Sequence, residues 1–196
     1  MVVFSPILIL VAVLIKVYDG GPIFYKQERL TYDHKVFMIY KFRSMKTDAE
    51  KDGVARLAGE HDDRITPVGR VIRKVRIDEL PQLLNILKGD MSIVGPRPER
   101  PELAAENEKI MPEFRYRLKV KAGLTGYAQV LGKYNTTPYD KLRLDLMYIE
   151  QYSLLLDIKL ILMTIKILFI PESTEGVRAT TPRAQPYKLF ISEISL

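Results

Sequence analysis

Residues 78–98 decide how the middle of the chain folds, and they read DELPQLLNILKGDMSIVGPRP. Pro81 suits the first turn of a helix, and Gly89 suits its end. Three leucines form the apolar stripe of this helix: Leu83, Leu84 and Leu87. We therefore predict a helix that begins at Glu79 or Leu80 and continues to Lys88.

The segments on either side of this helix predict a mixed fold. Met91 to Val94 is short and strand-like, and the proline-rich residues 95–101 form a stiff loop. Aromatic and β-branched runs with a turn between them predict a β-hairpin; the runs are 23–27 and 35–42, and the turn is 32–34. Helical patterns occur at 67–76, 102–110 and 139–150. Residues 47–59 are polar and charged, which is typical of an exposed helix or a loop.

The expected fold class is therefore α/β in the irregular, α+β sense: a β-hairpin and a small sheet with several helices. The chain has 196 residues, which suggests one domain with a real core. It has no Cys and two His, which excludes disulfides, thiolate nucleophiles and a three-histidine metal site. Covalent chemistry would therefore use a carboxylate, a hydroxyl or a lysine.

The charge balance points to an anionic partner or simply to a soluble surface. Lys and Arg number 30 against 24 Asp and Glu, a net charge of +6. Nucleic acid, a phosphorylated ligand and an acidic lipid would each suit this excess. The basic clusters have neither the spaced aromatic residues of a single-strand binder nor a glycine-rich phosphate loop.

The amino-terminal segment is apolar but short. Nine apolar residues, 7–15, follow Ser5 and Pro6 and end at Lys16. As a helix they rise roughly 13–14 Å, less than half of a ~30 Å hydrocarbon layer. The segment is therefore either a buried core helix or a helix that enters one leaflet and is broken at Pro6.

The segment 152–170 is also apolar but carries three charges. Asp157, Lys159 and Lys166 interrupt it, and a straight membrane span with three charges is costly. An interfacial amphipathic helix and an ordinary core helix both suit it better. Pro171 ends the pattern.

The densest group of charged residues surrounds Asp78 and Glu79. Asp78 can cap a helix and Glu79 can complement its dipole, and spacing alone favours this interpretation. Alternatively, the carboxylates could bind Mg²⁺ or attack phosphorus, with nearby cations attracting the phosphate. The cations that precede the pair are Arg64, Arg70, Arg73, Lys74 and Arg76.

A second basic cluster lies on the predicted hairpin: Lys26, Arg29, Lys41, Arg43 and Lys46. Lys41 and Arg43 are two residues apart, so in a strand they share one face and could hold a diphosphate. A solvated sheet face is the alternative.

Seven ordered motifs resemble the bacterial sugar transferases, the monotopic polyprenyl-phosphate phosphoglycosyl transferases. The motifs are GPIFYKQER at 21–29, YKFRSM at 40–45, DRIT at 63–66, DELPQ at 78–82, KGDMSIVGPRPE at 88–99, GLTGYAQV at 123–130 and DLMYIE at 145–150. The resemblance covers about residues 4–170. It reverses the preference for a capping role at Asp78 and Glu79.

The resemblance implies transfer of a sugar 1-phosphate from a UDP-sugar to undecaprenyl phosphate, or another polyprenyl phosphate, with release of UMP. This would be the first membrane step of exopolysaccharide or capsule assembly. Asp78 would form a covalent phosphosugar-enzyme, and Glu79 would help the lipid phosphate attack it. Mg²⁺ would be the cofactor, with Asp78 and Asp145 as its candidate ligands.

The resemblance also assigns substrate-binding and membrane residues. The candidates for substrate binding are Lys41, Arg43, Arg64, Arg76, Pro96, Arg97, Pro98 and Gln129. Ser5 and Pro6 would form the break of a re-entrant membrane helix over 1–20. The catalytic domain would cover 21–170, and 171–196 would be a carboxyl-terminal extension.

The implied location is the cytoplasmic face of the bacterial inner membrane, with helices along the bilayer and membrane lipids as partners. No nucleic acid partner is expected, and homo-oligomerisation is left open. Residues 133–137 favour glucose or galactose as the sugar, and the short arm before Ser5 suggests a longer parent chain. The alternative function is a non-catalytic basic protein that binds a membrane surface.

Overall fold

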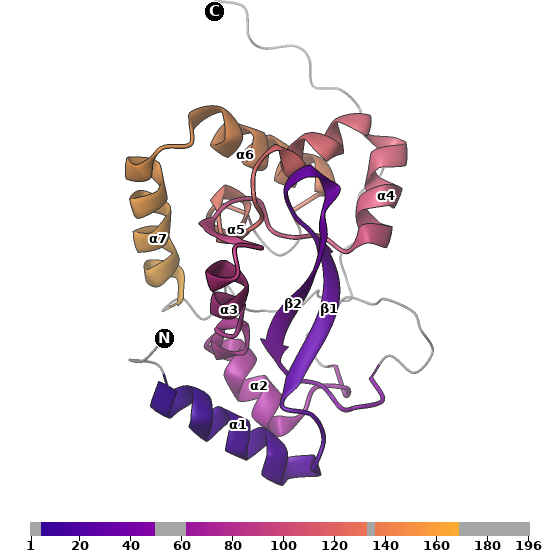
Figure 1. Ribbon diagram of the computed structural model, residues 1–196, viewed down its shortest axis with the longest axis vertical. Helices are drawn as coiled ribbons and strands as arrows, with labels where there is room; N and C mark the ends of the chain where they lie inside the picture. The colour runs from indigo at the N-terminus through magenta and orange to yellow at the C-terminus, as the bar shows by residue number, and fades with distance from the viewer. Residues whose placement is uncertain (1–4, 50–61, 133–135, 169–196) are drawn as a thin grey trace, which may run out of the picture.

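The structure is a computed structural model that describes residues 5–49, 62–132 and 136–168 (Figure 1). The predicted carboxyl-terminal extension, 171–196, and most of 47–59 lie outside the described residues. The predicted hairpin is present, and it runs through the middle of the molecule (Figure 1). Strand β1 (Phe24–Leu30) pairs antiparallel with β2 (Val36–Phe42), and η2 (Tyr32–His34) forms the turn.

Helices surround the hairpin, and the mixed α+β class is confirmed. They are α1 (Ser5–Asp19), α2 (Pro67–Lys74), η3 (Ile77–Glu79), α3 (Gln82–Leu87), α4 (Pro101–Ile110), η4 (Pro112–Lys119), α5 (Tyr127–Val130), α6 (Pro138–Gln151) and α7 (Leu154–Leu168). The helices expected at 67–76, 102–110 and 139–150 correspond to α2, α4 and α6. The predicted strand at 91–94 is β3 (Ser92–Val94), and it pairs in parallel with β4 (Gly123–Thr125).

The core consists of four small apolar clusters arranged along the hairpin. At the open end of the hairpin, Val11 and Ile15 of α1 pack near Phe42 and Ile72. At the turn end, Leu30 packs with residues of α4, η4 and α6. The other two clusters lie under β2 and between β3 and α7. Figure 1 shows the same arrangement, with α1 and α2 at the open end and α4 and α6 near the turn.

The helix predicted from Glu79 or Leu80 to Lys88 corresponds to α3, but its leucine stripe is only partly correct, because Leu83 and Leu84 are half-buried and Leu87 is exposed. Leu87 is 73% exposed, whereas Asn85 is completely buried. The reason is that β2 needs polar partners on the edge opposite β1. The backbone N–H of Tyr40 donates to Asn85 Oδ1 (3.0 Å), and Asn85 Nδ2 donates to the Met38 carbonyl (2.8 Å). Asn85, rather than one of the leucines, is therefore the most buried residue of α3.

Replacement of Asn85 by alanine is expected to lower the free energy of unfolding by about 2–4 kcal/mol. The substitution removes two hydrogen bonds and leaves a backbone N–H and a carbonyl of β2 without these partners. Chemical denaturation measures the loss, with Leu87→Ala on the same helix as the matched control. Equal stability of the two variants would contradict this role for Asn85.

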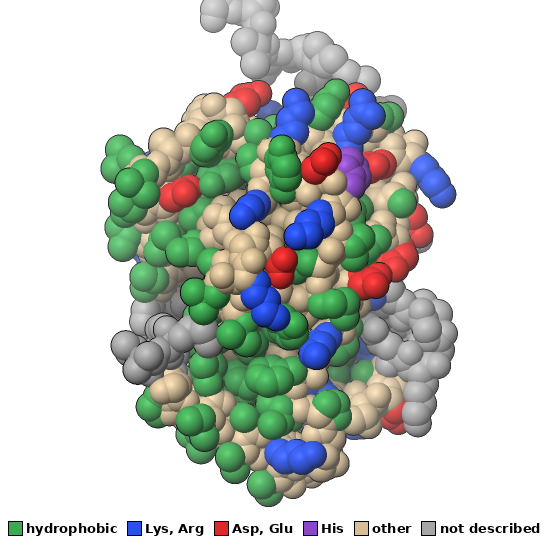
Figure 2. Space-filling view, in the orientation of Figure 1, with side chains coloured by type: hydrophobic (Ala, Val, Ile, Leu, Met, Phe, Trp, Pro, Cys, Tyr) green, Lys and Arg blue, Asp and Glu red, His purple; other side chains and the backbone are tan. Residues whose placement is uncertain are grey.

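Two helices bury one side and expose apolar residues on the other. Helix α1 buries Val11 and Ile15 but exposes Ile9, Leu10, Val13, Leu14 and Val17. Helix α7 buries Leu160 and exposes Leu154, Leu155, Ile158, Leu162 and Ile165. Figure 2 shows hydrophobic side chains along the flank formed by α7 and across the end formed by α1.

Ser5 and Pro6 form the first turn of α1, and residues 1–4 lie outside the described residues. The predicted break at Ser5 and Pro6 therefore stays a prediction. Among the helices in the described part of the chain, none combines the length and the hydropathy that a membrane span requires.

Candidate active site

The chain turns sharply to present Asp78 and Glu79. Thr66 caps the start of α2, where its hydroxyl oxygen accepts from the Gly69 N–H (2.9 Å). The helix ends at Lys74, and Arg76 adopts a left-handed conformation with φ 54°. This conformation is unfavourable for a residue other than glycine, and it prevents α2 from continuing into η3. The single turn of η3 then carries both carboxylates.

Glu79 is held by two cations from distant parts of the chain. Its Oε1 accepts from Lys41 Nζ on β2 (2.8 Å) and from Arg97 Nη2 after β3 (2.7 Å). Burial opposes the charge, but Arg97 and Lys41 outweigh it and hold the pKa of Glu79 well below its usual range. Glu79 also raises the pKa of Arg97. Glu79 and Arg97 are therefore both charged at neutral pH.

Asp78 has a different environment from its neighbour. Within the described part of the chain it has no hydrogen-bond partner, although Lys41, Arg73 and Arg97 attract its charge. Burial and the negative charge of Glu79 outweigh these cations and raise the pKa of Asp78 from 3.8 to about 6. Asp78 is therefore ionised at pH 7.5 but more nucleophilic than an ordinary aspartate. Two neighbouring carboxylates, one with a raised pKa and the other with a lowered pKa, are typical of catalytic pairs.

The Pro96-Arg97-Pro98 loop is fixed by β3, β4 and α5. Gly95 N–H donates to the Thr125 carbonyl (2.8 Å), and Gly123 N–H donates to the Pro96 carbonyl (2.9 Å). A Cβ atom at Gly95 would lie 2.4 Å from the Lys121 carbonyl oxygen, so only glycine fits there. Pro96 and Pro98 are buried, and the Arg97 side chain extends to Glu79. Gln129 Nε2 lies 3.5 Å from the Gly95 carbonyl, beside the same loop.

The structure gives three predicted phosphate ligands other surroundings. Arg43 is buried and bonds the Pro22 carbonyl (2.6 Å) and the Asp19 carboxylate, which joins the end of α1 to the hairpin. Arg64 pairs with Asp62 (2.6 Å). Arg76 sits at the left-handed turn before η3. Of the predicted phosphate ligands, Lys41 and Arg97 contact the carboxylate pair.

Asp145 is paired with Arg117 rather than placed as a free metal ligand. Arg117 Nε donates to Asp145 Oδ2 (2.5 Å), and both side chains are almost fully buried. Among the described residues, no group of three or more acidic, His or Cys side chains is arranged to hold a metal ion. Arg117 was not among the predicted site residues, and no motif in the sequence connects it with Asp145.

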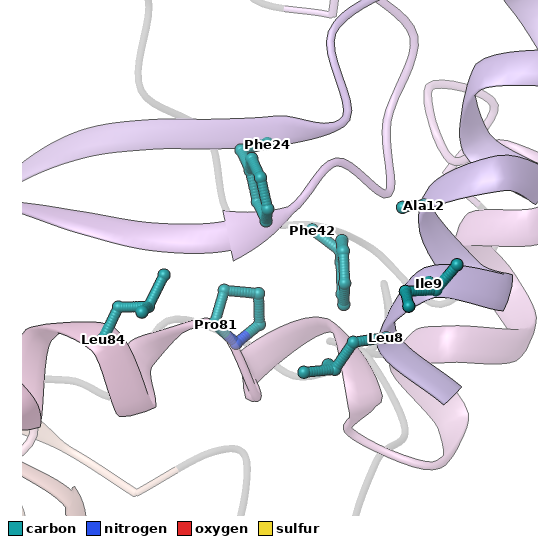
Figure 3. Close-up of a pocket in the computed structure, with 7 residues that line it drawn as sticks. All are labelled: Leu8, Ile9, Ala12, Phe24, Phe42, Pro81 and Leu84. Carbon is teal, nitrogen blue, oxygen red and sulfur yellow. The ribbon is translucent and has the colours of Figure 1, made fainter. Parts of the chain in front are cut away.

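An apolar pocket of about 210 Å³ lies between α1, the hairpin and the start of α3 (Figure 3). Three elements contribute to it: Leu8, Ile9 and Ala12 from α1, Phe24 and Phe42 from the hairpin, and Pro81 and Leu84 from the α3 region. The two phenylalanine rings stack with centroids 5.5 Å apart. Of the lining residues, Pro81 is the one nearest in sequence to the carboxylate pair, two residues after Glu79.

The sequence of the chain is similar to those of several known proteins. Residues 1–171 match the family model described as bacterial sugar transferase. The chain is 44% identical over 166 residues to the UDP-N-acetylgalactosamine-undecaprenyl-phosphate N-acetylgalactosaminephosphotransferase of Aeromonas hydrophila, covering 83% of this chain and 39% of that protein. It is 44% identical over 170 residues to the undecaprenyl-phosphate glucose phosphotransferase of Komagataeibacter xylinus, covering 83% and 32%.

A shorter relative matches along most of its length. The chain is 37% identical over 185 residues to the exopolysaccharide production protein PSS of Rhizobium leguminosarum bv. phaseoli, covering 90% of each chain. The chain therefore spans about a third to two fifths of the first two relatives and most of the third.

Proposed function

Because the chain belongs to the bacterial sugar transferase family, we propose that it transfers a sugar 1-phosphate from a UDP-sugar to undecaprenyl phosphate and releases UMP. This reaction would begin the assembly of an exopolysaccharide or capsule repeat unit. The observation that carries the proposal is the half-buried pair Asp78–Glu79, in which Lys41 and Arg97 hold Glu79 and Asp78 stays available.

The proposed reaction has two displacements at one phosphorus atom. An oxygen of Asp78 attacks the sugar-linked phosphorus of the donor, and the bond from that phosphorus to the bridging oxygen breaks, so that UMP leaves with the electron pair. An oxygen of undecaprenyl phosphate then attacks the same phosphorus and releases the Asp78 carboxylate. Splitting one transfer into two steps lets each substrate react in turn.

Lys41 and Arg97 would stabilise the negative charge on the phosphoryl groups. Their contacts with Glu79 fix where their remaining N–H groups point, which is the advantage of a preorganised charge. The lowered pKa of Glu79 makes it a poor proton acceptor. We therefore assign Glu79 the role of holding these cations, rather than that of a general base.

The residues present suit Mg²⁺ bound jointly with the donor. Mg²⁺ commonly uses one or two carboxylates together with substrate phosphates, and Asp78 offers a carboxylate without a hydrogen-bond partner in the described part of the chain. Asp78 and the diphosphate would hold the ion, which would neutralise charge on the leaving group. Asp145 is a weaker candidate ligand, because Arg117 already occupies its carboxylate.

The apolar surfaces support a location at the membrane. The exposed faces of α1 and α7 would rest on the bilayer, at the cytoplasmic face of the inner membrane. The pocket beside Pro81 would take the first part of the polyprenyl chain. Glucose or galactose is the proposed sugar.

Placing a polar side chain in this pocket is expected to weaken use of the lipid alone. Leu84→Gln should raise KM for undecaprenyl phosphate about tenfold, because burying an amide against apolar atoms costs at least about 1.4 kcal/mol. Leu87→Gln, the same change on an exposed site of the same helix, should leave KM unchanged. Steady-state kinetics with varied lipid measure both, and equal effects would remove the pocket from lipid binding.

The first displacement is expected to need the ionised form of Asp78. Because its pKa is about 6 in the free enzyme, kcat/KM for the reaction with donor alone should be constant above pH 7 and fall towards tenfold per pH unit below about pH 6. Rapid-quench measurements from pH 4.5 to 8 test this. An inflection near pH 4, where an ordinary aspartate titrates, would contradict the raised pKa.

UMP release tests the function as a whole. The chain is incubated in lipid with a panel of UDP-sugars that includes glucose, galactose and N-acetylgalactosamine, with and without undecaprenyl phosphate and Mg²⁺. We expect UMP release and a lipid-linked sugar with at least one donor. Salt-sensitive vesicle binding without UMP release from any donor would instead favour the non-catalytic membrane-surface protein.

A further inference from the structure

We propose that Arg117 and Asp145 form a positioning pair that holds Arg97 against Glu79. The inference rests on the proposed function, since it assigns to the pair an effect on phosphoryl transfer. The three residues come from η4, α6 and the loop after β3, so the arrangement exists only in the folded chain.

The contacts form a continuous path from α6 to the carboxylate pair. Asp145 accepts from Arg117 Nε (2.5 Å), and Arg117 Nη2 donates to the backbone carbonyl of Arg97 (2.9 Å). The Arg97 side chain then donates to Glu79 (2.7 Å). One guanidinium thus joins the helix to the loop.

Burial fixes the part of this path from Asp145 to the Arg97 backbone, whereas the Arg97 side chain itself is 42% exposed. The Arg117 and Asp145 side chains are 4% and 1% exposed, and the Arg117 guanidinium lies 4.6 Å from the centre of the Phe114 ring. Glu99, which follows the loop, lies 3.8 Å from Arg117 Nη1. Water cannot readily compete for these groups, so the Arg97 carbonyl is held in one place.

Stability alone is a weak explanation for such a pair. A buried ion pair often contributes less to stability than apolar residues of the same volume, because both charges lose their water. The forked arginine does something that an apolar residue or a lysine cannot, since it bonds a carboxylate and a backbone carbonyl in fixed directions at once. The bonded carbonyl is that of Arg97, and the side chain of the same residue contacts Glu79.

A double-mutant cycle separates positioning from stability. Arg117→Lys keeps the positive charge beside Asp145 but loses the fixed hydrogen bond to the Arg97 carbonyl. Asp145→Asn keeps the size of the side chain. We expect each to lower kcat for UMP release about tenfold in the otherwise unchanged chain. In an Arg97→Ala background we expect each to lower it less than twofold, because the group being positioned is gone. Asp140→Asn, the same change on the same helix without a path to Arg97, serves as the control.

Hydrogen–deuterium exchange of the peptide that contains Arg97 provides a readout without activity. It should become faster in Arg117→Lys and stay unchanged in Asp140→Asn. Two results would overturn the inference even when the wild-type chain is active. One is that Arg117→Lys and Asp145→Asn lower kcat by the same factor with and without Arg97, and the other is unchanged exchange in Arg117→Lys. Absence of UMP release from the wild-type chain would overturn the proposed function, and the exchange experiment would still decide whether the pair holds the loop.

Discussion

The Asp78→Asn variant is expected to lose turnover by on the order of a thousandfold or more, because an amide cannot replace the carboxylate as nucleophile. UMP release in the presence of donor and undecaprenyl phosphate measures the loss. Asp90→Asn is the matched control, since the contact that the structure describes for the Asp90 carboxylate is a long pair with Lys35 (3.8 Å). Near-normal activity of Asp78→Asn would exclude the covalent role.

The same variant should fold more stably than the wild-type chain at neutral pH. The pKa of Asp78 is raised from 3.8 to about 6, so the folded state loses stability as the pH rises through about 6. Removing the charge should therefore recover up to about 3 kcal/mol at pH 7.5 and nothing below about pH 4. Thermal melting at the two pH values checks this. A drop in melting temperature at pH 7.5 would show that the loss of activity reflects misfolding.

Glu79→Gln is expected to slow both displacements by roughly a hundredfold, as expected for loss of a preorganised electrostatic contact. The neutral amide would leave Lys41 and Arg97 charged but no longer held in place. KM for the donor should therefore not rise, while kcat falls.

Single-turnover experiments separate this role from general-base catalysis by Glu79. If Glu79 only removed a proton from the lipid phosphate, UMP release with donor alone would proceed at the wild-type rate, and only the lipid step would slow. Glu102→Gln, in the exposed first turn of α4, is the control and should have no effect on either step. A wild-type first step in Glu79→Gln would contradict the anchoring role.

Local patterns predicted the elements of the fold better than their contacts. The hairpin, α2, α4 and α6 follow from strand and helix signals that act within a few residues. The buried face of α3 does not, because Asn85 is buried only to satisfy backbone groups of β2, about 45 residues earlier in the chain. Hydrophobic spacing carries no information about such a partner.

In the candidate site too, local motifs indicated the residues better than their contacts. Asp78 and Glu79 could be selected from motifs, and so could Lys41 and Arg97. The sequence could not show that Arg43 would be used to join α1 to the hairpin, or that Asp145 would meet Arg117. Both pairings connect residues more than twenty positions apart, and each charged residue also fits a phosphate or metal site when considered alone.

Intact-mass measurement after incubation with the UDP-sugar alone tests the central claim most directly. The chain is mixed with a donor that supports turnover, quenched before any lipid is added, and then digested to locate the modified peptide. We expect a mass increase of one phosphosugar on the peptide that contains Asp78, absent from Asp78→Asn and removed by undecaprenyl phosphate. An unchanged mass under conditions in which added lipid still yields product would contradict the covalent intermediate.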